Sequence, residues 1–507
     1  MSNFQINRRH FLGTMSMLGV ALATPAAIAK TTNVPEKWDR TVNFLIIGTG
    51  FAGLAAALEG HFLGMKDIVV VDKMPLPGGN SIINGGAVAA AGTDMQKERG
   101  IEDNADLLYE DILRAGGKIN HAELARVIAD NSLENYYWLR DKIGVKFNNV
   151  YFHGGHSVKR SHGVEAHSGA GFIMPMLAKC KEFKIPVEQR TMVDELVVDE
   201  KGRVLGVKLR KDFNFNKPES GTVQYVRAKH GVLLATGGFS QNVKMRMSHD
   251  PRLTADFSST NHPGATGEMI QQAQMIGANT VHMDWIQLGP WTSPDEKGFG
   301  IAPLFVEALV GFGAMIDPET GKRFIKETGN RKVRADAIVA MGHPAILYAA
   351  DKNVQNQAAK NMSPEQMETL LKKGVVKKFD TLKAMADFYK IPYEELAKTN
   401  DKMNGYIKAK KDPEFDCLFF DDSFPNDEGP FWAVRLWPRV HHCMGGLEIN
   451  DKAQVVNALG FPIPGLYAAG EVTGGVHGMV RLGTVAVADC MIFGRTAART
   501  AQKIEIK

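Results

Sequence analysis

A short basic stretch in the middle of the chain contains residues that could do acid chemistry. Residues 321–334 read GKRFIKETGNRKVR and hold six lysines or arginines beside a single carboxylate, Glu327. Most such runs are solvated surface faces. A guanidinium has a pKa above about 12, so it could donate a proton only in a desolvated site where a carboxylate returns that proton. From this stretch alone, it could be either a solvated surface face or part of a buried site in which an arginine acts as an acid.

A glycine-rich segment near the N-terminus predicts dinucleotide binding. The apolar run 42–47 leads into Gly48, Gly50 and Gly53, which open an Ala/Leu-rich helix. Asp72 ends a second apolar run, IVVVDK, nineteen residues after Gly53. The glycines allow the backbone to approach a pyrophosphate at a helix N-terminus, and the acid binds ribose hydroxyls. Because strand, turn, helix, strand and acid follow in this order, we predict a dinucleotide site.

Three further segments favour FAD over NAD. GGNSIINGGAV (78–88) is a small-residue loop that could pass along a ribityl chain and ring. GVLLATGGFS (231–240) is a strand running into a turn, and GLYAAGEVTGGVHG (465–478) is a strand followed by glycines. Together they indicate an α/β flavoprotein whose second domain is inserted between two parts of the FAD-binding fold. The predicted FAD contacts in and near these segments are Lys73, Gly79, Asn80, Ser81, Gly85, Gly86, Thr236, Gly237 and Glu471.

Four motifs carry a resemblance to a known family. They are STNHPGATGE (259–268), VEALVGFGAMIDPETGKRF (306–324), HHCMGG (441–446) and AAGEVTGGVHGMVRLG (468–483). With them the chain resembles the flavoprotein domain of soluble fumarate reductases and flavocytochromes c. These belong to the larger succinate dehydrogenase, fumarate reductase and aspartate oxidase superfamily.

The resemblance implies a Rossmann-like FAD-binding domain with an inserted α+β capping domain. It adds His442 and Leu482 to the expected FAD contacts. In the membrane-bound relatives a histidine binds FAD covalently, whereas the corresponding loop here has Gly79. We therefore expect FAD to be bound noncovalently, and we expect no metal site.

The resemblance also implies which residues handle the proton. In fumarate reductases an arginine seven residues after the GKRF turn delivers a proton to the substrate carbon, and that position is Arg331. Glu307 matches the glutamate of the proton relay. The relay arginine three residues further on is replaced by Val310, and Arg334 or Lys332 could substitute for it.

His441 and Arg481 match the family's pair that clamps one substrate carboxylate. An arginine fork and a histidine suit a planar carboxylate, and their charge polarises a conjugated C=C bond toward hydride attack. Fumarate reductases hold the second carboxylate with a histidine and a threonine, which are Gly289 and Val306 here. An unpaired carboxylate in a dry site costs several kcal/mol. We therefore expect an apolar or missing substituent at that end, with His153, Trp291 and Phe305 as further contacts.

These features predict a 2-enoate reductase acting on an α,β-unsaturated monocarboxylate. Acrylate or methacrylate is preferred over bulkier cinnamates, although Gly289 could equally open space for a ring. Reduced FAD would give a hydride from N5 to Cβ, and Arg331 would protonate Cα. Three alternatives stay open: fumarate reductase itself, a flavin oxidase or dehydrogenase, and a noncatalytic electron-relay subunit.

The electrons must come from another protein. The four cysteines, Cys180, Cys417, Cys443 and Cys490, include no C-x-x-C-H motif, so covalent c-type haem is excluded on this chain. We predict a separate multihaem c-type cytochrome as the donor, in preference to NADH. The formal net charge of +4 gives no argument for nucleic acid.

The first residues predict export. Arg8 and Arg9 precede an apolar run of about 13 residues, shorter than the roughly 20 needed to cross a bilayer, and AIA at 27–29 resembles a cleavage site. Residues 1–29 are thus predicted to be a twin-arginine signal peptide. The mature protein would be periplasmic, without membrane insertion.

The chain of 507 residues is long enough for two or three domains. From the resemblance we place the FAD-binding domain at 30–285 and 439–507, with the capping domain at 286–438 between them. The cap would carry Glu307 and Arg331 over the flavin, and its hinge motion would admit substrate and exclude water.

Overall fold

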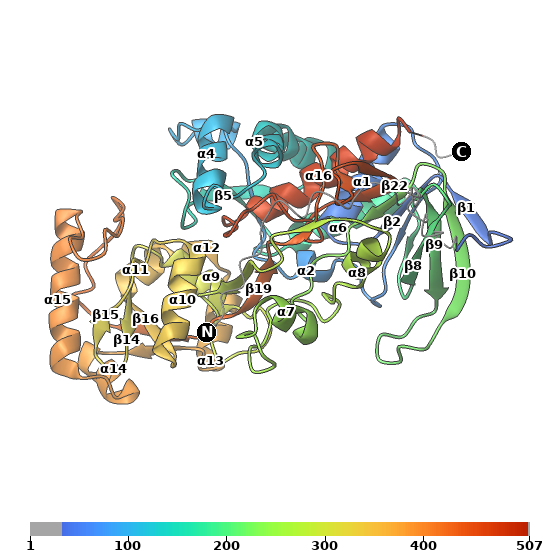
Figure 1. Cartoon of the computed structure of the whole chain (residues 1–507). Coiled ribbons are helices and arrows are strands. Elements are labelled where there is room, and N and C mark those ends of the chain that lie inside the picture. Colours follow the sequence, from blue (N-terminus) through green and yellow to red (C-terminus); the bar gives the residue numbers. More distant parts are fainter. Residues whose placement is uncertain (1–32, 505–507) are drawn as a thin grey trace, which may run out of the picture.

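The computed structural model describes residues 33–504, so the predicted signal peptide lies outside the described residues. Figure 1 shows two bodies of secondary structure. An α/β body is built from the N-terminal and C-terminal parts of the chain, coloured blue, green and red. A cap is built from the middle of the chain, coloured yellow to orange.

The α/β body is built around a six-stranded, mostly parallel sheet. Its strands, in spatial order, are β21 (Gln454–Val456), β22 (Pro462–Ala468), β11 (Val232–Leu234), β2 (Phe44–Ile47), β3 (Ile68–Val71) and β7 (Val187–Glu188). All but β21 run parallel to their neighbours. β2 and β3 are buried along their whole length, as expected for parallel strands covered on both faces.

The glycine turn after β2 starts the first long helix, α1 (Phe51–Phe62). Gly48 has φ +112°, and a Cβ there would lie 2.2 Å from the Ala235 carbonyl oxygen of the neighbouring strand end. A Cβ at Gly53 would lie 2.0 Å from the carbonyl oxygen of Gly48. Glycine is therefore needed at both positions for α1 to begin at the carboxyl edge of the sheet.

Further sheets and helices complete the α/β body. A four-stranded sheet contains β1 (Arg40–Val42), β10 (Thr222–Ala228), β9 (Val204–Lys211) and β8 (Met192–Val198), and a three-stranded sheet contains β4 (Ala87–Ala89), β6 (Ser161–Val164) and β5 (Phe147–Tyr151). β12 (Thr280–Val281) pairs with β20 (Gly446–Leu447). The helices are α2 (Gly79–Ile82), α3 (Asp94–Lys97), α4 (Ala105–Ala115), α5 (Ala122–Tyr137), the π-helical turn η1 (Trp138–Ile143), α6 (Ala170–Glu182), α7 (Val243–His249), α8 (Glu268–Met275) and α16 (Val485–Ala501).

The cap is an α+β unit. Its antiparallel sheet has the spatial order β15 (Lys322–Arg323), β14 (Ala314–Asp317), β16 (Ala345–Ala350), β18 (Phe431–Leu436) and β17 (Val376–Phe379). Its helices are α9 (Ala302–Ala308), α10 (Arg331–Met341), α11 (Asp351–Asn356), α12 (Ala358–Asn361), α13 (Pro364–Lys372), α14 (Leu382–Tyr389) and α15 (Tyr393–Ala409). The paired strands β13 (Ile286–Gly289) and β19 (Arg439–Cys443) lead into and out of the cap.

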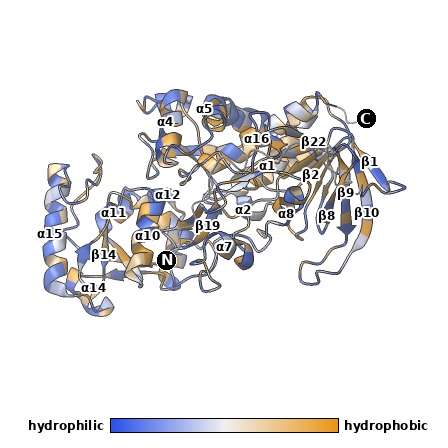
Figure 2. Cartoon of the chain, in the orientation of Figure 1, coloured by the Kyte–Doolittle hydropathy of each residue, from blue (hydrophilic) through white to orange (hydrophobic). Residues whose placement is uncertain are grey.

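The hydrophobic cores follow this division. The largest core draws its buried residues from 42–283 and 443–501, whereas two smaller cores lie wholly within 291–436. In Figure 2 the central strands carry much of the hydrophobic colour, and α15 at the outer edge of the cap is largely hydrophilic. Within residues 33–504, every helix is too short or too polar to cross a bilayer. The exact domain boundaries at 285/286 and 438/439 stay a prediction.

Candidate active site

Two adjoining cavities lie at the carboxyl edge of the central sheet and under the cap. The first is lined by the glycine turn after β2, by Asp72 and by α2. The second is lined by Trp291, Arg331, His441 and other residues of the cap and the C-terminal part. Residues shared by both linings connect the two cavities, namely Phe51, Asn80, Ser81, Glu471 and Cys490.

Most of the residues predicted to contact FAD line these cavities. They are Gly48, Gly50, Asp72, Lys73, Gly79, Asn80, Ser81, Gly85, Gly86, Thr236, Gly237, His442 and Glu471. Gly53 and Leu482 do not. Gly53 instead permits the close contact between α1 and the preceding turn, and Leu482 packs its side chain against Gly155. Their direct contact with FAD stays a prediction.

Asp72, directly after β3, and the adjacent Lys73 both make hydrogen bonds to other groups of the protein. The Asp72 carboxylate accepts hydrogen bonds from the backbone nitrogens of Thr49 (3.0 Å) and Met74 (2.9 Å), and from the Thr49 hydroxyl. Lys73 donates to the Glu268 carboxylate at 2.8 Å. Asp72 is thus oriented at the cavity wall, and Lys73 has a partner of its own.

Several buried polar groups at the cavities lack a protein partner. The Thr236 hydroxyl and His442 Nε2 make no hydrogen bond to any residue of the described chain. Glu471 accepts from the Cys443 backbone nitrogen at 2.9 Å and faces the Asn80 amide at 3.4 Å, and burial raises its pKa to about 7. An unpaired buried donor or acceptor costs about 1–3 kcal/mol unless a ligand satisfies it. The glycine cradle and these groups together fit an FAD molecule.

The basic stretch at 321–334 contains buried arginines as well as lysines that lie at the surface. Arg331 and Arg334 on α10 are buried near the second cavity. Arg323 is also buried, but its guanidinium pairs with the carboxylates of Glu327 (2.6 Å) and Asp412 (2.7 Å) inside the cap. The three lysines are more exposed and make surface ion pairs. Half of the cations are therefore structural or site residues.

Arg331, Glu307 and Arg334 form one buried group. Glu307 Oε1 lies 3.8 Å from Arg331 Nε and accepts a hydrogen bond from Arg334 Nη2 at 3.1 Å. Burial disfavours the charged carboxylate, but Arg334 and Arg331 outweigh this effect and lower the pKa of Glu307 to about 2. Lys332 pairs instead with Asp336 on the surface. Of the two predicted substitutes for the missing relay arginine, the structure places Arg334 against Glu307.

Arg331 stands where a guanidinium is easier to deprotonate than in water. It begins α10, whose N-cap Asn330 accepts a hydrogen bond from the Val333 backbone nitrogen at 3.0 Å. The positive end of a helix dipole disfavours a cation. Burial lowers the pKa of Arg331, the nearby Arg334 lowers it further, and Glu307 opposes both. This environment suits an arginine that gives up a proton.

A β-bulge presents His441 to the cavity. In the pairing of β13 with β19, Gln287 faces His442 whereas Leu288 faces Val440, so His441 is the extra residue. Bulges of this kind re-aim a side chain and are common next to active sites. The His441 side chain lines the second cavity as a result.

The predicted clamp is brought together from segments far apart in the sequence. His441 and Arg481 line the same cavity. His441 Nδ1 lies 2.8 Å from the Thr260 hydroxyl, and Arg481 donates one bond to the Leu482 carbonyl at 3.0 Å while its Nε stays unpaired within the described chain. Thr260 was not predicted from the sequence, although it lies inside the STNHPGATGE motif.

The electrostatics of the clamp favour a bound anion. Burial lowers the pKa of His441 well below its ordinary value, with Arg481 and Arg331 adding to the effect. Burial likewise lowers the pKa of Arg481 to about 9, with Arg331 adding to it. A bound carboxylate would offset both penalties, because opposite charge favours the charged form of each group.

The residues at the predicted second clamp lie behind the cavity wall. Gly289 and Val306 are absent from the lining, as is Phe305, whose ring packs toward Trp432 at 6.3 Å in the cap core. A Cβ at Gly289 would lie 2.9 Å from the indole of Trp291, so this glycine makes room for the indole and not for a substrate ring. Contact of these three residues with substrate stays a prediction, whereas Trp291 lines the cavity.

His153 lines the same cavity as the clamp and the acid. Its Nδ1 lies 2.9 Å from the Ser161 hydroxyl, which lies 3.0 Å from the hydroxyl of Thr484. Thr484 donates its only hydrogen to the Gly483 carbonyl, so Ser161 donates to Thr484 and His153 Nδ1 must donate to Ser161. Nε2 of His153 is then a bare acceptor, and burial keeps the ring neutral by lowering its pKa to about 4. A neutral acceptor offers nothing to a second carboxylate.

Tyr151 is a cavity residue that sequence reasoning missed. It lines the same cavity as His153, and the two ring centroids are 5.1 Å apart. Burial raises the pKa of its phenol, so the group stays a hydrogen-bond donor. Because alternate residues of an extended segment share a face, His153 could have pointed to the residue two positions earlier.

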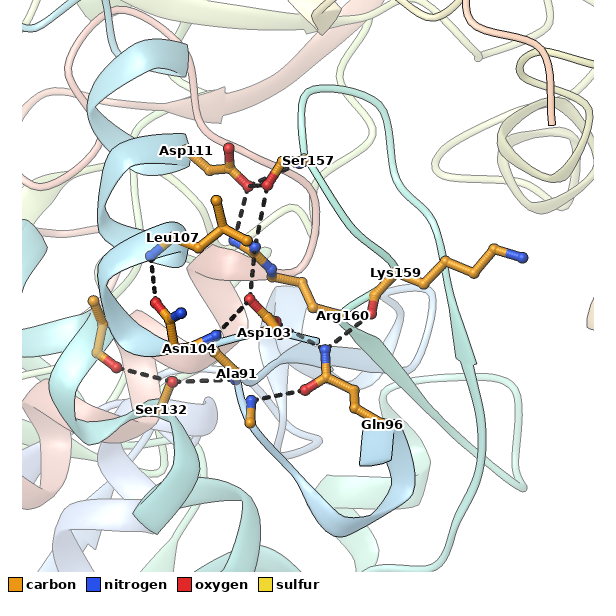
Figure 3. Close-up of polar contacts among 12 residues, drawn as sticks. Ala91, Gln96, Asp103, Asn104, Leu107, Asp111, Ser132, Ser157, Lys159 and Arg160 are labelled. Carbon is orange, nitrogen blue, oxygen red and sulfur yellow. Dashed lines mark hydrogen bonds and ion pairs between the residues drawn. The ribbon is translucent and has the colours of Figure 1, made fainter. Parts of the chain in front are cut away.

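A buried polar network anchors the loop that carries His153 (Figure 3). Arg160 lies between the carboxylates of Asp103 and Asp111, each 2.9 Å away, and all three side chains are fully buried. Asp111 also accepts from the backbone nitrogen of Ser157 at 2.8 Å. The residue next to Ser157, His156, has its Nε2 2.8 Å from the Gly483 carbonyl oxygen. The loop is thus tied both to α4 and to the turn that carries Arg481.

Comparison with known proteins finds related flavoproteins. A model of the FAD binding domain family matches residues 43–487. The acrylate reductase flavoprotein subunit of Shewanella woodyi is 42% identical over 503 residues, covering 97% of this chain and 98% of the relative. Urocanate reductase of Eggerthella lenta is 34% identical, covering 92% of this chain and 75% of the relative.

Solved structures agree as well. The open conformation of a flavocytochrome c3 fumarate reductase matches with a TM-score of 0.72 and 32% identity, covering 92% of this chain and 79% of that one. The predicted fold and the predicted family resemblance are thereby confirmed. The chain belongs to the FAD binding domain family and is an FAD-dependent oxidoreductase of the group that reduces carbon–carbon double bonds in enoates and fumarate.

Proposed function

We propose that the protein reduces the C=C bond of a small α,β-unsaturated monocarboxylate of the acrylate or methacrylate type. The observation that carries this proposal is the asymmetry of the second cavity. One side holds the anion clamp of His441 and Arg481, and another holds the acid group of Arg331 and Glu307. At position 289, where a second clamp would begin, the Trp291 indole fills the space.

Each of these residues has a separate role in the proposed reaction. His441 and Arg481 bind the substrate carboxylate and stabilise the negative charge that moves toward it when Cβ is attacked. FAD, when bound in the first cavity and reduced, would supply the hydride for Cβ. Arg331 then protonates Cα, and the Glu307 carboxylate returns to Arg331 a proton that it takes up from solvent. Arg334 holds Glu307 in place through the 3.1 Å hydrogen bond.

We also propose that the FAD is held noncovalently. Gly79, at the start of α2, lines the first cavity and offers no side chain for attachment. A Cβ at this position would meet nothing within 4 Å, so the glycine leaves open space beside the cofactor groove.

A separate multihaem c-type cytochrome is proposed as the electron donor. The relative from Shewanella woodyi is described as a flavoprotein subunit, which supports a partner for this chain too. A relative from Shewanella frigidimarina, 33% identical over 92% of this chain, is described as a fumarate reductase (cytochrome). The C-x-x-C-H motif is missing from this sequence, so the haem must lie elsewhere.

A substrate panel tests the proposal. The purified mature protein with reduced methyl viologen is expected to turn over acrylate or methacrylate fastest. Fumarate should have a kcat/KM lower by about 100-fold or more, because an unpaired buried carboxylate costs several kcal/mol. Crotonate, cinnamate and urocanate complete the panel, and NADH should not serve as donor.

Each alternative predicts a different result in the same assays. Fumarate reduced as fast as acrylate would indicate a fumarate reductase. Oxygen consumption with a saturated acid would indicate an oxidase, and the absence of turnover with every enoate would favour an electron-relay subunit.

We further propose that the twin-arginine segment exports the protein to the periplasm. Changing Arg8 and Arg9 together to lysine is expected to leave the precursor in the cytoplasm, because the pathway reads the arginine pair as an address. Fractionation followed by immunodetection measures this. Equal periplasmic amounts of the double variant and the wild type would contradict the proposal.

A further inference from the structure

We propose that Trp291 is the residue that determines substrate size, and that it restricts the enzyme to enoates whose Cβ carries only hydrogen. This inference rests on the proposed function and names its substrate class more closely. The predicted substrates are acrylate and methacrylate, which both end in a CH₂ group. Enoates substituted at Cβ, such as crotonate, cinnamate and fumarate, are excluded.

The first observation is that the indole and a side chain at position 289 compete for one volume. A Cβ on Gly289 would lie 2.9 Å from both Cη2 and Cζ3 of Trp291. Real Cβ contacts are essentially never this short, so a longer side chain at 289 would require the indole to move. The histidine of a second carboxylate clamp and Trp291 therefore cannot occupy their positions together.

The second observation is that Trp291 connects the two chemical ends of the cavity. Its ring meets the His441 ring edge-on, with centroids 4.6 Å apart, and the guanidinium carbon of Arg331 lies 5.3 Å from the ring centroid. In the proposed reaction His441 binds the carboxylate and Arg331 protonates Cα, so an indole touching both stands along the bound enoate. The second carboxylate of fumarate is attached to Cβ, so the part of the indole that fills the space beside position 289 faces a substituent on Cβ.

The third observation concerns how firmly the indole is held. Trp291 is only 2% exposed, and the Phe299 ring packs against it with centroids 5.7 Å apart. Its Nε1 has no hydrogen-bond partner among the described residues. A packed ring cannot retreat cheaply from a substituent on Cβ.

Shortening the side chain tests the proposal. In Trp291→Ala and Trp291→Phe, the ratio of kcat/KM for crotonate to that for acrylate should rise about 10–200-fold, the range that one methyl group controls in an apolar pocket. Reduced methyl viologen is the donor, and the flavin absorbance spectrum shows whether each variant is folded and loaded. Trp291→Phe keeps the test available if the alanine variant does not fold.

A substitution at Gly289 tests whether this position and the Trp291 indole compete for the same space. Gly289→Ala should push the indole into the cavity and lower kcat/KM for acrylate at least about 10-fold. The double variant Gly289→Ala/Trp291→Phe should recover most of this loss, because the smaller ring leaves room for the methyl group. Such non-additivity identifies residues in contact.

Two results would overturn the inference. One is a crotonate-to-acrylate ratio within about threefold of wild type in both Trp291 variants while acrylate is still reduced. The other is additive behaviour of the double variant. Failure of the proposed function is distinguishable, because the wild-type protein would then reduce neither acrylate nor methacrylate.

Discussion

Replacing Arg331 with glutamine is expected to lower kcat for acrylate reduction by about 10²–10⁴-fold, the usual contribution of a general acid. Glutamine keeps much of the length and the hydrogen-bonding capacity of the side chain, but it has no proton to give at Cα. The FAD should stay bound, because Arg331 lies only in the second cavity and not in the dinucleotide groove. Stopped-flow mixing of the reduced enzyme with acrylate measures the loss directly.

The neighbouring residue provides the control. Lys332 lies on the same helix but pairs with Asp336 on the surface. Lys332→Ala should therefore retain the wild-type kcat. If Arg331→Gln reduced acrylate within about tenfold of wild type, another group would have to be the acid, and the proposed mechanism would be wrong.

Replacing Glu307 with glutamine is expected to impair both turnover and stability. Without the carboxylate no group returns the proton to Arg331, so kcat should fall by about 10²-fold or more. The change also leaves the guanidinium groups of Arg331 and Arg334 without a counter-ion in a buried site. Breaking a buried ion pair in this way costs about 3–5 kcal/mol.

The stability effect should depend on pH in a defined direction. The pKa of Glu307 in the folded protein is lowered from 4.5 to about 2. Its ionised form therefore stabilises the fold by about 3 kcal/mol above pH 4.5, and this contribution is lost as the pH falls toward 2. Below that range the protonated carboxyl and the glutamine amide are equivalent in charge.

Urea unfolding of both proteins between pH 6 and pH 3 measures this difference. The gap in free energy of unfolding between wild type and Glu307→Gln should be largest at pH 6 and should narrow toward pH 3. Glu319→Gln is a suitable control, because this carboxylate is exposed on the cap. A gap that stays constant over the range would show that Glu307 is not held ionised by its arginines.

The amino-acid sequence by itself predicted the FAD cofactor and the FAD-binding fold, which the comparisons confirm. The glycine turn, the helix after it and Asp72 follow one another within a short segment, so the chain's local pattern specifies their geometry. The residues that motif resemblance selected line one cavity, namely His441, Arg481, Glu307 and Arg331. The resemblance also identified Val310 as a departure from the family's relay, but it left two substitutes for that arginine.

Two points that the motifs left open were decided by the tertiary structure: which cation contacts Glu307, and whether Gly289 opens space for a substrate. Arg334 and not Lys332 reaches Glu307, because its position on α10 points into the protein while the lysine faces solvent. Gly289 accommodates the Trp291 indole and opens no space for substrate.

Local features could be predicted because they depend on residues close together in the sequence, whereas the others depend on residues far apart. A turn or a helix start depends on residues a few positions apart, and these can be read in order. Burial of a cation, the bulge that presents His441, and the competition for space beside position 289 depend on segments brought together only when the cap packs on the α/β body. The sequence therefore determined the cofactor and the chemistry, whereas folding decided the shape of the substrate cavity.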